Sequence, residues 1–214
     1  MSSARRPRIH VLAGVNGAGK SSIGGAAVRH HGGAYFNPDE AARSLQKIYP
    51  TLSQAEANSA AWNQGVRLLT RALTERLDFT FETTLGGSTI ANLLLRAVKQ
   101  GHEIHIWYVG LSGPDLHLER VRSRVSRGGH AIPERDIRRR YEHSRLNLIA
   151  LLPFLTTLHM YDNSVDADPA AGRTPQLTLV LHMRLGKVLG PLDLASTPTW
   201  AKPIVAAALK LGHR

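Results

Sequence analysis

The sequence of 214 residues contains no cysteine, so neither a disulfide framework nor a thiolate metal site can form. It also lacks long apolar runs. The longest, around residues 147–155, is interrupted by Pro153 and falls short of the roughly 18 residues that a membrane span requires. The 11 histidines form no H-x-x-x-H or H-E-x-x-H pattern, so we expect no zinc site. These absences favour a cytoplasmic protein in a reducing compartment, with no membrane association.

Aromatic and acidic residues are both scarce. Aromatic residues make up 6% of the chain, and 16 acidic residues face 27 lysines and arginines, which gives a net charge of +11. A nucleic-acid partner would account for such a charge, but few side chains are available to stack on bases. Because the arginines concentrate between residues 120 and 145, we favour a local role around nucleotide phosphates. Nucleic-acid binding and simple solvation of helix faces remain alternatives.

A glycine-rich motif, GVNGAGKSS, follows the apolar run Ile9–Ala13. It matches G-x-x-x-x-G-K-[ST], the P-loop, whose backbone N–H groups and following helix N-terminus bind phosphate. Lys20 is expected to reach the β- and γ-phosphates of ATP, and the Ser21 hydroxyl to ligate Mg²⁺. The predicted nucleotide-binding residues are Gly14, Asn16, Gly17, Ala18, Gly19, Lys20, Ser21 and Ser22.

Strand-like and helix-like segments alternate along the chain, which predicts one α/β domain over residues 1–214 with a mostly parallel sheet flanked by helices. The P-loop makes it a P-loop NTPase, with a core at about 8–164 and a C-terminal hairpin and helix at about 176–211. The expected strands are 8–13, 34–36, 78–82, 103–109, 158–161, 177–183 and 187–189. The expected helices are 19–30, one starting at Pro38, 53–76, 88–100, 114–127, 133–149 and 200–211, with 165–175 a loop.

Three acidic residues stand at the carboxyl ends of predicted strands, where α/β sheets place their ligands. Asp39 is a candidate general base for a substrate hydroxyl, or alternatively an acid that complements a helix dipole. Glu82 is a candidate for binding substrate hydroxyls or for holding Mg²⁺ through water, or alternatively a helix cap. Asp162 and the Asn163 that follows it fit the adenine side of the site, but a turn explains them equally well.

The arginine-rich segment is interrupted by Gly128-Gly129, which fits the hinge of a lid. Arginines carried by such a lid neutralise the charge that develops on a transferring phosphoryl group. Each arginine alone is more often a surface residue, although we expect one or two to reach phosphate. His130 is expected to be structural or to contact substrate.

Five local motifs occur in order: GVNGAGKSS at 14–22, FNPDE at 36–40, FETTLGG at 81–87, RVSRGGHAIPERDIRRRYEHS at 124–144 and YDNS at 161–164. Together they resemble the zeta-toxin family of P-loop kinases over roughly residues 8–164. The resemblance implies a nucleotide-kinase-like core with an arginine-rich lid, and an ATP- and Mg²⁺-dependent small-molecule kinase. Zeta toxins phosphorylate the 3′-hydroxyl of the sugar of UDP-N-acetylglucosamine, and an epsilon antitoxin inhibits them.

Carried over by motif, the resemblance assigns roles to individual residues. It makes Asp39 the catalytic base beside Lys20. Glu82 and Thr83, in ETT, match the family's substrate-binding strand end. Our expected substrate-binding residues are these two together with Asp39, Thr84 and His130. The lid arginines are assigned to Arg124, Arg127 and Arg139. Two rival functions stay open: a polynucleotide 5′-kinase, which the basic charge favours, and a non-catalytic module that senses ATP. The GGHxIP variant and the compact C-terminal region depart from the best-known plasmid toxins.

Overall fold

The computed structural model describes residues 5–21, 35–165, 177–191 and 193–212. The helix expected over 19–30 and the loop expected over 165–175 fall largely outside these residues, as does Ser22 entirely. The described strands are β1 (Arg8–Ala13), β2 (Tyr35–Phe36), β3 (Phe79–Thr83), β4 (Glu103–Gly110), β5 (Thr157–Asp162), β6 (Thr178–Arg184) and β7 (Lys187–Gly190). The described helices are α2 (Pro38–Ile48), α3 (Gln54–Glu75), α4 (Ser88–Lys99), α5 (Pro114–Val125), α6 (Glu134–Leu151) and α7 (Lys202–Gly212), with a short 3₁₀ helix at Leu152–Phe154. Among these helices, none has both the length and the apolar composition needed to cross a membrane.

The seven strands form one sheet in the order β2-β3-β1-β4-β5-β6-β7. The first five are parallel, and the C-terminal hairpin adds β6 and β7 antiparallel to β5. This confirms the predicted mostly parallel α/β sheet and its terminal hairpin, whose turn places Gly186 at a φ of +77°. The observed strand and helix ends lie within a few residues of the predicted ones.

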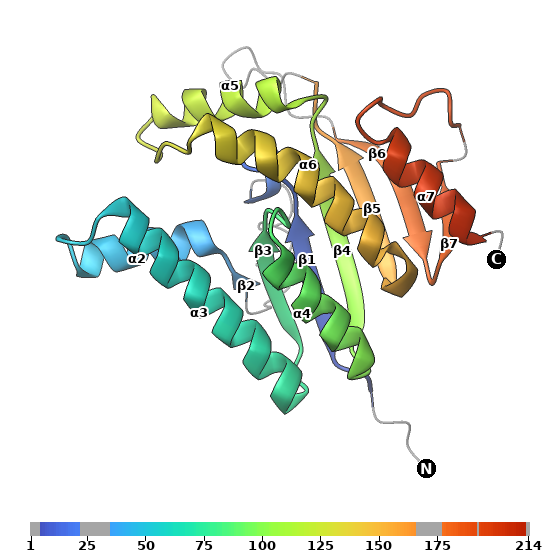
Figure 1. Cartoon of the computed structure of the whole chain (residues 1–214), viewed down its shortest axis with the longest axis horizontal. Coiled ribbons are helices and arrows are strands. Elements are labelled where there is room, and N and C mark those ends of the chain that lie inside the picture. The colour runs from blue at the N-terminus through green and yellow to red at the C-terminus, as the bar shows by residue number, and fades with distance from the viewer. Residues whose placement is uncertain (1–4, 22–34, 166–176, 192, 213–214) are drawn as a thin grey trace.

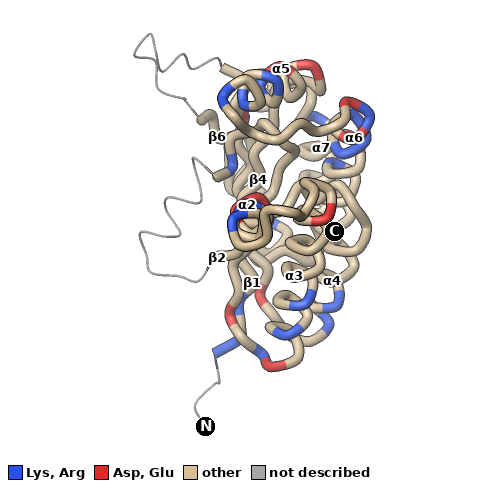
Figure 2. Tube along the Cα trace, turned by 90° about the vertical axis from the view of Figure 1, so that its left-hand side faces the viewer, with Lys and Arg blue, Asp and Glu red and all other residues tan. Residues whose placement is uncertain are grey.

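The two faces of the sheet differ in composition. Figures 1 and 2 show α3, α4, α6 and α7 together on one side of it. Alternate residues of β1, β4 and β5 point toward these helices and form a continuous buried core, which includes Val11, Ile106 and Met160. On the opposite face, five rings form a row across β1, β4, β5 and β6: His10, His105, Trp107, His159 and His182.

Neighbouring rings in this row are in stacking distance. The centroids of His10 and His105 lie 4.9 Å apart, and those of His159 and His182 lie 4.2 Å apart. Because β-strands alternate their side chains between faces, in-register pairing of four strands lines these rings up. Burial lowers the pKa of His10 to about 4, and it also lowers the pKa of His105 and of His159. A row of imidazoles packed in this way is most stable uncharged.

Local sequence explains the helices that shape the site. Asn37 caps α2: its Oδ1 accepts hydrogen bonds from the N–H groups of Asp39 at 2.8 Å and Glu40 at 3.3 Å, and Pro38 occupies the first turn. Ser53 and Glu56 form the predicted capping box at the start of α3. Both helices therefore begin where the sequence places them, and α2 carries Asp39 directly after β2.

Candidate active site

The P-loop follows β1 at the carboxyl edge of the sheet, where β2 and β3 also end. Gly14 adopts a φ of +141°, and a Cβ there would lie 2.2 Å from the Val109 carbonyl oxygen, so only glycine fits this turn. The Gly14 N–H donates to the Thr83 carbonyl at 3.2 Å, which ties the start of the loop to the end of β3. Lys20 is only 7% exposed, and its Nζ lies 3.4 Å from both the Val15 carbonyl oxygen and a carboxylate oxygen of Glu82.

Glu82 is the centre of a buried polar cluster at the end of β3. Its Oε2 accepts hydrogen bonds from Ser21 Oγ at 2.8 Å, Tyr35 Oη at 2.6 Å and Asn37 Nδ2 at 3.2 Å. Its Oε1 faces Lys20. The carboxylate is 8% exposed, and the cation and these donors balance its burial. The structure thus brings the predicted residues Lys20, Ser21 and Glu82 together.

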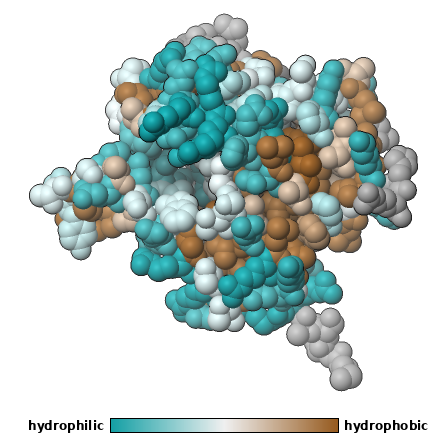
Figure 3. Space-filling view, viewed as in Figure 1, coloured by the Kyte–Doolittle hydropathy of each residue, from teal (hydrophilic) through white to brown (hydrophobic). Residues whose placement is uncertain are grey.

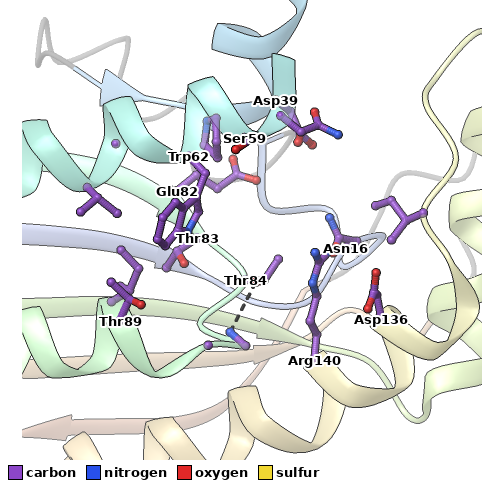
Figure 4. Close-up of a pocket in the computed structure, with 18 of the residues that line it drawn as sticks. Asn16, Asp39, Ser59, Trp62, Glu82, Thr83, Thr84, Thr89, Asp136 and Arg140 are labelled. Carbon is purple, nitrogen blue, oxygen red and sulfur yellow. Dashed lines mark hydrogen bonds between the residues drawn. The ribbon is translucent and has the colours of Figure 1, made fainter. Parts of the chain in front are cut away.

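Asp39 lies in the first turn of α2 and faces the same cavity as the P-loop (Figure 4). Its side chain is 39% exposed, and its Oδ2 lies 3.6 Å from Nη1 of Arg124 at the end of α5. Arg124 also donates from Nη2 to the His130 carbonyl at 3.2 Å. Burial lowers the pKa of His130, which the Asp39 carboxylate partly opposes. Arg124 therefore connects two predicted residues that line the cavity, the carboxylate of Asp39 and the backbone of His130.

Arg140 of α6 bonds the P-loop directly. Its Nη1 donates to Asn16 Oδ1 at 2.8 Å, and burial lowers the pKa of its guanidinium. A Cβ at Gly86 would come within 2.7 Å of the Arg140 side chain, so the loop after β3 packs directly on this arginine. The sequence pattern places Arg140 in the arginine-rich segment without singling it out. A signal is present, because Arg140 lies three residues after Ile137 and flanks the buried face of α6.

Two of the predicted lid arginines point elsewhere in this structure. Arg127 donates to the carbonyl and hydroxyl oxygens of Ser123, within its own helix turn. Arg139 pairs with Asp136 at 3.1 Å and is 61% exposed. Neither lines the cavity among the described residues. Their assignment to phosphate stays a prediction.

The segment Gly128-Gly129 terminates α5. Gly128 has a φ of +87°, and the Gly129 N–H donates back to the Arg124 carbonyl at 3.0 Å, as at many helix C-termini. This bond and the one from Arg124 to His130 hold the connection toward α6 against α5. Motion of the segment as a lid stays a prediction.

The candidate site is a cavity of about 420 Å³ between α2–α3 on one side and residues 130–133 with the first half of α6 on the other. In the space-filling view the surface is hollowed there, beside the hydrophilic side chains of α5 and α6 (Figure 3). The volume lies within the range of small-molecule sites. The predicted residues Asn16, Asp39, Glu82, Thr83, Thr84 and His130 all line it. The walls add aromatic, polar and charged side chains that the sequence did not single out: Phe36, Asn58, Ser59, Trp62, Thr89, Asp136 and Arg140.

The loop after β3 forms the floor of this cavity. The hydroxyl oxygens of Thr83 and Thr84 accept hydrogen bonds from the N–H groups of Leu85 at 3.0 Å and Gly86 at 3.3 Å. Each hydroxyl hydrogen stays available to donate to a bound molecule. Leu85 is fully buried with a φ of +53°, a left-handed conformation that is costly for leucine. Burial of Leu85 and the bond from Asn147 Nδ2 to its carbonyl at 2.8 Å hold the loop in this shape.

The chain is similar to known proteins in sequence. The family model described as zeta toxin matches residues 1–153. An uncharacterised protein of Haemophilus influenzae is 30% identical over 131 residues, which cover 60% of this chain and 88% of that protein.

Two solved structures share the fold. The crystal structure of AvrRxo1-ORF1:-ORF2 with ATP superposes with a TM-score of 0.67 at 15% identity, over 92% of this chain and 66% of that one. The chromosomal toxin–antitoxin system PezAT of Streptococcus pneumoniae superposes with a TM-score of 0.55 at 16% identity, over 98% of this chain and 87% of that one. This confirms a P-loop kinase-like architecture. Since the family model spans well over half of the sequence, the chain belongs to the zeta toxin family.

Proposed function

We propose that this protein is an ATP-dependent phosphotransferase that carries the γ-phosphate to a hydroxyl of a nucleotide sugar such as UDP-N-acetylglucosamine. One observation carries the proposal: Asp39 and Glu82 line both the large cavity that Arg140 also lines and the small recess at the P-loop that Lys20 lines. Glu82 in turn contacts Lys20 and Ser21. Phosphoryl transfer needs these three elements, which are a phosphate cradle, a base for the acceptor and positive charge at the transferring group.

The residues around Ser21 suit a magnesium–nucleotide complex. Mg²⁺ in such sites is held by one or two protein oxygens together with phosphate oxygens and water. The Ser21 hydroxyl and the Glu82 carboxylate lie 2.8 Å apart and supply such oxygens. When bound, the metal would neutralise charge on the phosphates. Ser21 would be the direct ligand, and Glu82 would orient it or a metal-bound water.

Asp39 is placed to act as the general base. It lines both the recess at the P-loop and the larger cavity, in the first turn of α2. In the proposed reaction the Asp39 carboxylate accepts the proton of the attacking hydroxyl. Arg124, 3.6 Å from this carboxylate, holds it in place, and Arg140 faces the developing negative charge.

The outer part of the cavity fits an acceptor that contains a ring. Trp62 of α3 lines the cavity and is 48% exposed, which is high for so large an apolar side chain. Figure 4 shows it beside Glu82 and Thr83. An indole face stacks on flat bases and on the apolar faces of sugars. The hydroxyl groups of Thr84 and Thr89 are available to bind polar groups of the same molecule.

The direct test measures transfer of labelled γ-phosphate from ATP into UDP-N-acetylglucosamine, other UDP-sugars and DNA oligonucleotides. We expect label in a UDP-sugar. The variant Asp39→Asn should lower transfer by roughly 10²- to 10⁴-fold and leave ATP affinity unchanged. Asp115→Asn serves as the matched control, because Asp115 is an 83% exposed carboxylate on α5 that pairs with Arg138.

The same experiment separates the alternatives. Label only in the oligonucleotide would indicate a polynucleotide kinase. Several arginines of α5 and α6 pair with acids of the same two helices, including Arg138 with Asp115 and Glu134, which makes this alternative weaker. ATP binding without transfer to any acceptor, unchanged by Asp39→Asn, would indicate the ATP-sensing module. Full transfer by the Asp39→Asn variant would contradict the assignment of the base.

We also propose a protein partner that restrains the enzyme. The similar PezAT structure is described as a toxin–antitoxin system. If this chain acts alike, its expression should slow bacterial growth, and the Asp39→Asn variant should not. A wild-type protein that transfers phosphate yet leaves growth unchanged would separate the chemistry from the toxin role.

A further inference from the structure

Two buried polar side chains from distant parts of the sequence hold the P-loop from outside. His117 of α5 contacts the Asn16 carbonyl, and Asn163, just after β5, contacts the Ala18 carbonyl. They come 101 and 145 residues after the positions they contact. Neither residue lines the cavity, so neither is positioned to contact the acceptor.

His117 bonds the loop through its ring. Its Nδ1 lies 2.8 Å from the Asn16 carbonyl oxygen, and the side chain is 1% exposed. Because a carbonyl only accepts hydrogen bonds, Nδ1 must carry the hydrogen and donate. Burial lowers the pKa of His117 to about 4, so the ring is neutral near pH 7 with its proton on Nδ1. The backbone of α5 also meets the loop, since a Cβ at Gly17 would lie 2.9 Å from the His117 carbonyl oxygen.

Asn163 bonds the loop from the other side. Its Nδ2 donates to the Ala18 carbonyl at 2.9 Å, and the residue is 4% exposed. Its own N–H donates to the Gly110 carbonyl at 3.0 Å, which fixes it to the end of β4. The preceding Asp162 accepts a hydrogen bond from Trp200 Nε1 at 3.0 Å. The turn that carries Asn163 is therefore anchored at several points.

These bonds determine the direction of two peptide planes. In a trans peptide the C=O of one residue and the N–H of the next point in opposite directions. A bond from His117 to the Asn16 carbonyl therefore turns the N–H of Gly17 away from α5. A bond from Asn163 to the Ala18 carbonyl likewise turns the N–H of Gly19 away from β5. Backbone N–H groups of this loop are what a P-loop offers to phosphate.

We infer that His117 and Asn163 are positioning residues that orient the P-loop N–H groups for phosphate before the nucleotide binds. The inference rests on the proposed nucleotide site and deepens it. Glycine-rich backbone otherwise has access to many conformations, and ordering it at the moment of binding reduces affinity. Two external hydrogen bonds make this ordering part of folding. Binding then uses donors that already point the right way.

The test uses substitutions that remove or restore the donor. His117→Leu and Asn163→Leu fill roughly the same space with an apolar side chain, but leave the carbonyl groups of the loop without a hydrogen-bond donor. His117→Asn keeps an amide N–H near the position of Nδ1. Matched controls are His143→Asn on α6 and Asn63→Leu on α3, both at exposed positions. Calorimetry would give the dissociation constants of ATP and of inorganic tripolyphosphate, with thermal unfolding measured in parallel.

We expect each leucine variant to bind ATP about tenfold more weakly, the effect of one lost buried hydrogen bond. The affinity for tripolyphosphate should fall by the same factor, because the substitution affects only the binding of phosphate groups. His117→Asn should recover most of the affinity, and the controls should match the wild type. A purely structural role would lower the unfolding temperature and leave both dissociation constants unchanged.

Several outcomes would overturn the inference. Leucine variants that bind ATP as tightly as the wild type would contradict it. A His117→Asn variant that binds ATP as weakly as His117→Leu would also contradict it. The test measures binding and not transfer, so it remains valid even when the true acceptor is not a UDP-sugar. A wild-type protein that transfers phosphate but whose leucine variants bind normally refutes the inference alone. A wild-type protein that binds neither probe refutes the nucleotide site together with it.

Discussion

Arg139 and Arg140 are adjacent in sequence but differ in what they contact. Arg140 bonds the P-loop through Asn16, whereas Arg139 pairs with Asp136 at the surface of α6. We predict that Arg140→Met lowers kcat/KM by roughly 10²- to 10³-fold, as expected for loss of a group that stabilises transition-state charge. Arg139→Met is the matched comparison, measured in the same transfer assay. A larger loss in Arg139→Met would mean that the segment rearranges on binding and would favour the assignment by resemblance.

Trp62 gives a second prediction for a single residue. Trp62→Ala should raise the KM for the acceptor by about tenfold, the cost of losing one aromatic stacking partner, and leave the KM for ATP unchanged. Trp62→Phe should retain most of the affinity. The two other tryptophans are less exposed than Trp62, so a fluorescence change when UDP-N-acetylglucosamine is added should disappear in Trp62→Phe. Equal acceptor KM values in wild type and Trp62→Ala would exclude the stacking role.

Sequence patterns located some of these residues and not others, for a physical reason. The P-loop and Asp39 follow strands closely and Glu82 lies at the end of one, so strand order alone brings them together at one edge. A run of arginines specifies a charged helix but not which arginine faces the core, and Arg140 was therefore missed. The roles of Trp62, His117 and Asn163 depend on how α3, α5 and the end of β5 pack against the sheet, which local patterns do not encode.

The capping box of α3 allows a prediction about a single element. Ser53 Oγ and Glu56 satisfy N–H groups at the start of a 22-residue helix, and neither residue lines the cavity. Ser53→Ala should destabilise the protein by about 1 kcal/mol and lower Tm by roughly 2–4 °C, with kcat unchanged. Ser44→Ala is the control, because Ser44 is an exposed serine within α2 and not at its N-cap. Thermal unfolding and the transfer assay check both variants. Equal Tm values would mean that the cap contributes nothing.

At the scale of elements the sequence was most informative. Helix ends were marked by caps and glycines, and strands by β-branched or alternating runs, so most boundaries were correct within a few residues. The short β2 is recognisable because Asn37-Pro38-Asp39-Glu40, which marks a helix start, follows it directly. The conformation of Leu85 was not predictable, since leucine rarely adopts a positive φ and only tertiary packing enforces it here.

The row of imidazoles on the sheet predicts how stability responds to pH. His10 of this row, and likewise His117 of α5, have pKa values lowered from 6.5 to about 4. Between these pH values the unfolded chain therefore binds protons that the folded chain does not. The contribution of these histidines to the free energy of unfolding should therefore be fully present above pH 6.5 and should be lost as the pH drops toward 4. Urea unfolding at pH 7.5, 6 and 5 should show this decline.

Replacement of one ring tests the cause. His10→Phe keeps a stacked aromatic ring but cannot take up a proton, so its stability should fall less steeply between pH 6.5 and 4 than that of the wild type. His143→Asn changes a histidine at the surface of α6 and provides the control. Identical slopes for wild type and His10→Phe would assign the acid sensitivity to other groups.

The attachment of α6 has a consequence for inhibitor design. Arg140 bonds the P-loop, Asn147 bonds the loop after β3, and Ser144 meets Tyr108 of β4 at 3.0 Å. Helix α6 is thus fastened to two loops and one strand, whereas α3 lies across the cavity from it with Trp62 and the polar side chains Asn58 and Ser59. A synthetic ligand should therefore present its rigid, anionic portion to Arg140 and its adaptable ring to Trp62. A compound with the opposite arrangement would fit only if α6, the more firmly held wall, changed its position.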